Sequence, residues 1–81
     1  MNKTHELKTW PEYYSALRDL TKNFEVRLND RDFKVGDTLI LKEYNNITNS
    51  YTGNKVVRTI TYILHGGNFG IESGYCVIGL Q

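Results

Sequence analysis

The stretch Phe24-Glu25-Val26-Arg27-Leu28 alternates strictly between apolar and charged side chains. Because successive side chains of a β-strand point to opposite faces, this stretch predicts a strand with one apolar and one charged face. The segment from Val56 to Leu64 is long and rich in β-branched residues, which predicts a central strand. Further strands are expected at Thr38 to Tyr44 and Tyr75 to Leu80, and an edge strand or extended arm at His5 to Thr9.

A helix is predicted to begin at Thr9-Trp10-Pro11-Glu12. In this pattern Thr9 caps the helix, Pro11 lies in the first turn and Glu12 completes a capping box. An apolar stripe with the spacing of an amphipathic helix follows, formed by Tyr13, Ala16, Leu17 and Leu20. We expect the helix to end near Thr21 to Asn23.

The order of the expected elements favours one mainly β domain. The expected strands and helices do not alternate along the chain, so a doubly wound parallel sheet is not expected. We therefore expect a mainly β (α+β) fold with one or two helices over residues 1–81, built as a small antiparallel barrel or strongly curved sheet with the helix across its open end. Asn45 to Asn54 is expected to be a flexible hairpin loop, and the glycine-rich segment from His65 to Gly70 a tight turn.

Composition limits the classes of function. The 81 residues suffice for one core; 40% are hydrophobic, 12% aromatic and 23% charged, as in an ordinary globular domain. The net charge is only +1, so any contact with phosphate must come from a local patch. One cysteine cannot form an internal disulfide, and neither a signal peptide nor a long apolar run is evident, so we expect a cytoplasmic protein without membrane contact.

Three charged side chains are the strongest candidates for a site: Lys22, Glu25 and Arg27. Arginine can hold a phosphate with its planar fork, glutamate can accept from a base edge or act as a general acid–base group, and lysine can supply a charge or a nucleophile. On spacing alone, an exposed strand face with an ordinary salt bridge is the more frequent explanation. Arg31 and Lys34 extend the positive stretch, but Asp30 and Asp32 interrupt it.

The other candidate residues have two interpretations each. Trp10 is either a platform on which a base stacks or part of a small core, and the core is favoured. His5 could act as a metal ligand or acid–base group, but with His65 as the second histidine and no cysteine cluster we expect neither a metal site nor a cofactor. Cys76 lies in an apolar strand and is expected to be buried.

The order of several short motifs resembles the ASCH (activating signal cointegrator homology) family of the PUA-like superfamily. The motifs are Lys22-x-x-Glu25-x-Arg27, followed by Gly36-Asp37. The beginning, His5 to Lys8, and the end, Gly74 to Gly79, resemble a short bacterial and phage branch whose function is not known. The resemblance implies a PUA-like barrel with a cleft beside the helix, lined by Lys22, Glu25 and Arg27.

The resemblance also implies binding of RNA or a nucleotide-derived ligand. In the first hypothesis the chain is a binding module, with Lys22, Arg27 and Arg31 on phosphate, Glu25 on a base edge and Trp10 stacking. In the second it is a small hydrolase of RNA or a modified nucleoside, with Glu25 and Lys22 catalytic. One enzymatic branch of the family has a threonine where this chain has Glu25, which counts against that chemistry. In the third it is a phage-derived protein-interaction factor that uses the 45–54 loop. The sequence predicts no oligomeric state.

Overall fold

The computed structural model describes residues 2–81 and contains one sheet and one α-helix within them. The elements follow in the order β1 (Thr4–Thr9), α1 (Pro11–Arg18), β2 (Phe24–Leu28), β3 (Thr38–Asn45), β4 (Ser50–His65) and β5 (Tyr75–Leu80). The strands form a five-stranded sheet in the order β1-β3-β4-β5-β2. The mainly β class with one helix is thus confirmed.

The sheet is mixed and open, which differs from the expected antiparallel barrel. Strands β1 and β3 run parallel, whereas the β3–β4, β4–β5 and β2–β5 pairs are antiparallel. Strands β1 and β2 are the two edges and do not pair with each other. The parallel pair arises because the chain leaves β1 through α1 and β2 and returns to β3 in the same direction.

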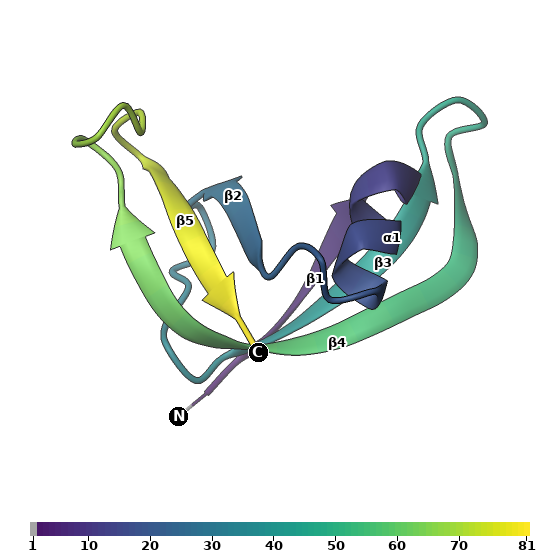
Figure 1. The fold of residues 1–81 in the computed structure, drawn as a ribbon, viewed down its shortest axis with the longest axis horizontal. Helices are drawn as coiled ribbons and strands as arrows, with labels where there is room; N and C mark the ends of the chain where they lie inside the picture. The colour runs from purple at the N-terminus through teal and green to yellow at the C-terminus, as the bar shows by residue number, and fades with distance from the viewer. Residues whose placement is uncertain (1) are drawn as a thin grey trace.

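Strand β4 joins the two halves of the sheet. Its first part pairs with β3 as far as Thr59, and its second part pairs with β5 from Ile60 onward. Figure 1 shows the resulting bend: β4 runs along the bottom of a V whose arms carry β1 and β3 on one side and β2 and β5 on the other. Its position in the middle of the sheet confirms the prediction of a central strand.

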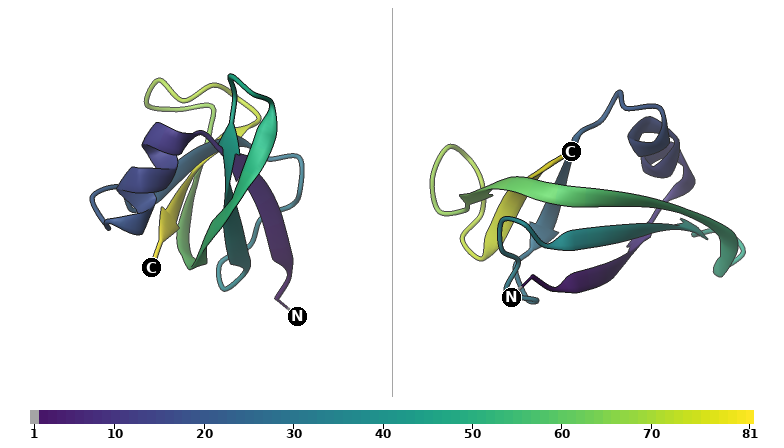
Figure 2. Two further views of the ribbon diagram at one scale, coloured as in Figure 1. Left: turned by 90° about the vertical axis from the view of Figure 1, so that its right-hand side faces the viewer. Right: turned by 90° about the horizontal axis from the view of Figure 1, so that it is seen from below.

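Helix α1 packs against β3 and β4 and lies beside the strands, as both views of Figure 2 show. Pro11 occupies its first turn, but the residue at the N-cap position is Trp10 and no side chain caps the helix, so the capping role predicted for Thr9 is wrong. The buried face is formed by Tyr14 and Leu17, whereas Tyr13 and Leu20 are exposed. The predicted stripe is therefore wrong at its two ends: Tyr14 is buried in place of Tyr13, and Leu20 lies beyond the end of the helix at Arg18, with a positive φ of 65°.

The hydrophobic core lies between the helix and the sheet. It is formed by Leu7, Leu17, Phe33, Leu39, Leu41, Ile60, Cys76, Ile78 and Leu80. Cys76 is fully buried, as predicted, and burial raises the pKa of its thiol. Burying such side chains supplies most of the favourable free energy of folding in a domain of this size.

Two connections are tighter than their composition suggests. The turn between β3 and β4 is confined to residues 46–49, because Ser50 to Asn54 already belongs to β4; the predicted long flexible loop is wrong. In the glycine-rich connection, the Gly66 amide donates to the Tyr75 carbonyl at 2.7 Å. A side chain at Gly66 would place its Cβ 2.1 Å from the Glu72 carbonyl oxygen, so this position requires glycine.

Candidate functional site

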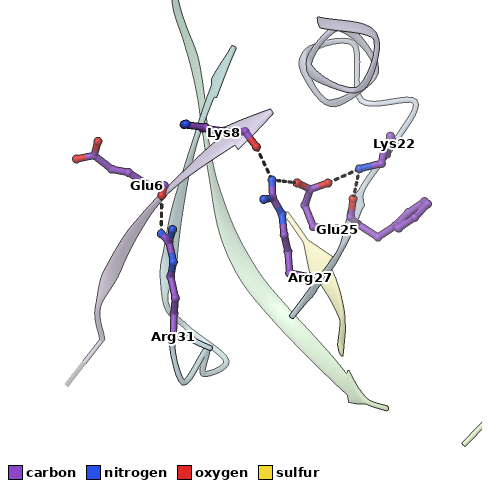
Figure 3. Close-up of polar contacts among 7 residues, drawn as sticks. Glu6, Lys8, Lys22, Glu25, Arg27 and Arg31 are labelled. Carbon is purple, nitrogen blue, oxygen red and sulfur yellow. Dashed lines mark hydrogen bonds and ion pairs between the residues drawn. The ribbon is translucent and has the colours of Figure 1, made fainter. Parts of the chain in front are cut away.

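The charged face of β2 points inward, which reverses the expected orientation. Phe24, Val26 and Leu28 are each about half exposed, whereas Glu25 is only 5% exposed. An edge strand can present its apolar face to solvent when a neighbouring element covers the other face. Here the chain between α1 and β2 and the end of β1 lie over Glu25 and Arg27 (Figure 3). The interpretation of these residues as a solvated strand face is therefore wrong.

Glu25 is held between two cations. Its Oε1 accepts a hydrogen bond from Arg27 Nη2 at 2.9 Å, and its Oε2 accepts one from Lys22 Nζ. A charged hydrogen bond of this kind is stronger than a neutral one, and its geometry fixes all three side chains. A carboxylate can accept about four hydrogen bonds, so Glu25 keeps acceptor capacity beyond these two. The structure thus brings together the three residues that the sequence singled out.

Lys22 is further fixed by its own surroundings. Its ammonium donates to the Phe24 carbonyl at 2.8 Å and lies 5.0 Å from the centre of the Phe24 ring and 5.7 Å from that of Tyr13. These are cation–π distances, at which a ring face attracts a positive charge. The lysine is therefore positioned by both the helix and β2.

Arg27 links the two edges of the sheet. Its Nη2 donates to the Lys8 carbonyl of β1 at 2.7 Å as well as to Glu25 (Figure 3). The carbonyl belongs to an edge strand of the sheet. A side chain thus spans β1 and β2 where a closed barrel would have backbone pairing.

A cleft of about 560 Å³ opens at this point. It is lined by parts of β1, α1, β2 and the connection before β2: Lys8, Thr9, Trp10, Tyr13, Lys22, Phe24, Glu25, Val26 and Arg27. Its walls combine cationic groups, one carboxylate and three aromatic rings. That volume lies in the usual range for small-molecule sites.

Trp10 belongs to the rim of the cleft, so its assignment to the core is wrong. Its side chain is 47% exposed and stacks on Tyr13, with ring centres 6.2 Å apart and planes 23° apart. Trp10 and Tyr13 are three residues apart at the start of α1, which places both rings on one side of the helix. That spacing was visible in the sequence and could have identified Tyr13 as a rim residue.

Thr9 is a cleft residue that sequence reasoning missed. It is buried, it lines the cleft, and among the described residues its Oγ1 is a buried side-chain atom with no hydrogen-bond partner. A buried hydroxyl without a partner costs free energy, so such groups are rare in native proteins. Nothing in the sequence distinguishes this threonine from a neutral strand residue.

Arg31 lies outside the cleft. Its Nη1 donates to the Glu6 carbonyl at 2.6 Å, farther along the outer edge of β1 (Figure 3). Arg31 and Arg27 thus bind successive outward-facing carbonyls of the same edge strand. The structure brings Arg27, but not Arg31, together with Lys22 and Glu25.

His5 forms a separate buried pair with Asp37. His5 Nε2 and Asp37 Oδ2 are 2.9 Å apart, and Asp37 also accepts backbone hydrogen bonds from Lys3 at 2.9 Å and Lys34 at 3.1 Å. Burial alone would raise the pKa of Asp37, but these three hydrogen bonds together hold it below its usual value. The pair ties the start of β1 to the turn before β3, so His5 has a structural role here. Residues 2–81 contain no group of three side chains suited to hold a metal ion.

These observations define a small mainly β domain with a cationic, aromatic-rimmed cleft between the edges of an open sheet. Residues 4–80 match the family described as "Domain of unknown function (DUF3850)", and the chain belongs to this family. It is also 39% identical over 61 residues to the "Uncharacterized 12.9 kDa protein in GpA 3'region" of Escherichia phage P2. That match covers 75% of this chain and 54% of the phage protein, so the chain spans about half the length of its relative. Within residues 2–81, no helix is both long and apolar enough to cross a membrane.

Proposed function

We propose that the cleft binds RNA or a nucleotide-derived ligand. The observation that carries the proposal is the combination found there: a buried Glu25 holds Lys22 and Arg27 in fixed positions beside the exposed ring of Trp10. Fixed cations suit phosphate oxygens, and an exposed indole suits the flat face of a base. The two halves of a nucleotide therefore meet complementary groups within one small cleft.

The division of roles follows from the contacts. Arg27 Nη2 already donates to Glu25 and Lys8, so its remaining N–H donors are available for a phosphate. Glu25 acts mainly by orienting the two cations and uses its remaining acceptor capacity for a base edge. The hydroxyl of Thr9 gains a partner if a ligand reaches the cleft wall, which would remove the cost of its unpaired state.

We also propose that the fold is related to the ASCH domains and to PUA-like folds. The charged members of the Lys22-x-x-Glu25-x-Arg27 pattern meet in the cleft. The Gly36-Asp37 pair that follows forms a tight turn, with φ of 95° at Gly36 and a buried Asp37. One part of the pattern thus serves the cleft and the other serves the fold, which supports a common origin for the whole pattern.

The direct test is the fluorescence anisotropy of labelled short RNAs and matched DNAs at low and moderate salt. Arg27→Ala removes charged hydrogen bonds to the ligand, so affinity should fall about tenfold or more. Arg31→Ala is the matched control, because Arg31 also donates to a β1 carbonyl but lies outside the cleft. Equal affinities of the wild-type protein and the Arg27→Ala variant for every nucleic acid would refute the proposed site.

A hydrolase is the second candidate, favoured by the direct contact between the Lys22 ammonium and the Glu25 carboxylate. In that reading Glu25 would move a proton and Lys22 would stabilise negative charge on the substrate. Incubation with RNA and with acylated nucleosides at high protein concentration tests it by product analysis. Absence of product over long times would eliminate this candidate and leave binding alone.

A further inference from the structure

A row of three lysines crosses the outer face of the sheet, beginning at Lys8 beside the cleft and continuing away from it. Lys8 of β1 lies in register with Lys42 of β3, and Lys42 lies in register with Lys55 of β4. Residues in register on neighbouring strands have their side chains on the same face, with strands about 4.8 Å apart. We call these residues the lysine row.

Like charges in register on neighbouring strands repel each other and destabilise a sheet. Only one carboxylate, Glu6, forms an ion pair with a member of the row in the part of the chain that the structure describes, at 3.1 Å from Lys42. Three cations facing one carboxylate leave an excess of positive charge on this face. A polyanionic ligand could compensate this excess of positive charge.

Two tyrosines lie next to the lysine row. Tyr44 of β3 is paired with Tyr51 of β4, and their ring centres are 5.1 Å apart at an interplanar angle of 73°. Lys8 Nζ lies 4.5 Å from the centre of Tyr44, and Lys42 Nζ lies 4.8 Å from that of Tyr51. Tyr51 is 49% exposed. Cationic groups beside aromatic rings, of which that of Tyr51 is half exposed, are the combination that proteins use to bind single-stranded nucleic acids.

Lys8 connects this face to the cleft. Its backbone carbonyl is bonded to Arg27 at the cleft, while its ammonium extends over Tyr44 on the outer face (Figure 3 shows the two ends pointing apart). The two surfaces are therefore separated by the width of the edge strand β1. A single strand held in the cleft can pass over this edge and reach the lysine row.

We propose that the lysine row and the Tyr44–Tyr51 pair form a second subsite for single-stranded RNA, occupied by nucleotides that continue from the cleft. This inference rests on the proposed function of the cleft and extends it from one nucleotide to a strand. It predicts that affinity depends on RNA length, because a mononucleotide occupies the cleft alone. An RNA of about 12 nucleotides also reaches the outer face.

The test variant is Lys55→Glu, which lies outside the cleft. It turns the repulsive Lys42–Lys55 pair into an attractive one, so thermal stability should be equal or higher. Affinity for the longer RNA should fall about tenfold and the salt dependence should weaken by about one phosphate contact, whereas the affinity for a mononucleotide stays unchanged. Lys34→Glu is the control, because it makes the same charge change at an exposed lysine outside both surfaces.

Tyr51→Leu is a second variant that keeps the apolar contact but removes the ring, and it should weaken only the longer RNA, about fivefold or more. Equal effects of Lys55→Glu and Lys34→Glu on the affinity for the longer RNA, with Arg27→Ala still weakening mononucleotide binding, would overturn the second subsite and leave the cleft intact. If Lys55→Glu lowers the affinity for the longer RNA and Arg27→Ala has no effect on binding, the outer face would be supported as an RNA site and the cleft refuted. If neither the mononucleotide nor the longer RNA binds the wild-type protein, both proposals fail.

Discussion

Glu25→Gln is the substitution that most sharply probes the buried charge cluster. Glutamine has nearly the same shape but no charge, so it leaves Lys22 and Arg27 close together without the carboxylate between them. Loss of one partner from a buried ion pair costs about 3–5 kcal/mol. Lys22 and Arg27 are 18% and 28% exposed, so they can turn partly toward water. We therefore expect Glu25→Gln to lower the free energy of unfolding by about 2–3 kcal/mol.

Thermal unfolding followed by circular dichroism measures this loss. For a domain of this size about 1 kcal/mol corresponds to roughly 4–8 °C, so the midpoint should fall by about 10–20 °C. Glu6→Gln is the matched control, because Glu6 pairs with Lys42 at 3.1 Å on the exposed surface. An exposed pair contributes about 0–1 kcal/mol. If Glu25→Gln costs no more than Glu6→Gln, Glu25 is not part of a buried network and the account of the cleft is wrong.

Three further predictions concern the fold. The pKa of Asp37 is lower in the folded than in the unfolded state, so its stabilising contribution is present above the unfolded-state pKa. This contribution is lost as the pH falls through the pKa of the folded state. Asp37→Asn should therefore make the free energy of unfolding, measured in urea at a series of acidic pH values, less dependent on pH. Gly66→Ala should destabilise by about 2 kcal/mol or more in urea unfolding, because its Cβ collides with the Glu72 carbonyl. Gly53→Ala should cost less, because its Cβ meets no atom within 4 Å and only the positive φ of 95° is unfavourable, at about 1–2 kcal/mol. Leu39→Ala should cost about 2–5 kcal/mol in the same assay, because Leu39 is fully buried in the core, and a loss below about 1 kcal/mol would contradict that packing.

The strands were largely predictable because their signal is local. Alternation at β2 and β-branched residues in β4 identified both strands, and the range of β5 was predicted correctly. The orientation of β2 was not predictable in this way, since alternation separates two faces without saying which one is covered. That depends on the connection between α1 and β2 and on the end of β1, which reach Glu25 and Arg27 only in the folded chain.

The parallel pairing of β1 with β3 has no local signal either. The sequence pattern of a strand does not show whether its neighbour runs parallel or antiparallel to it. The relative direction of the two strands depends on the path of the chain between them. The lysine row is a consequence of this register, because Lys8, Lys42 and Lys55 are far apart in the sequence. Trp10 illustrates the same limit: one aromatic residue at a helix start fits a core and a rim equally well until the packing is known.

Trp10 also offers the most direct measurement, since it is the only tryptophan and lies on the rim of the cleft. An unlabelled RNA trinucleotide is titrated into the wild-type protein and into Arg27→Ala while the tryptophan emission is recorded. A ligand in the cleft should change the emission in a saturable manner, and the Arg27→Ala variant should require about tenfold more RNA or more. An unchanged Trp10 emission while anisotropy reports RNA binding, or identical titrations of both proteins, would contradict the assignment of the cleft as the binding site.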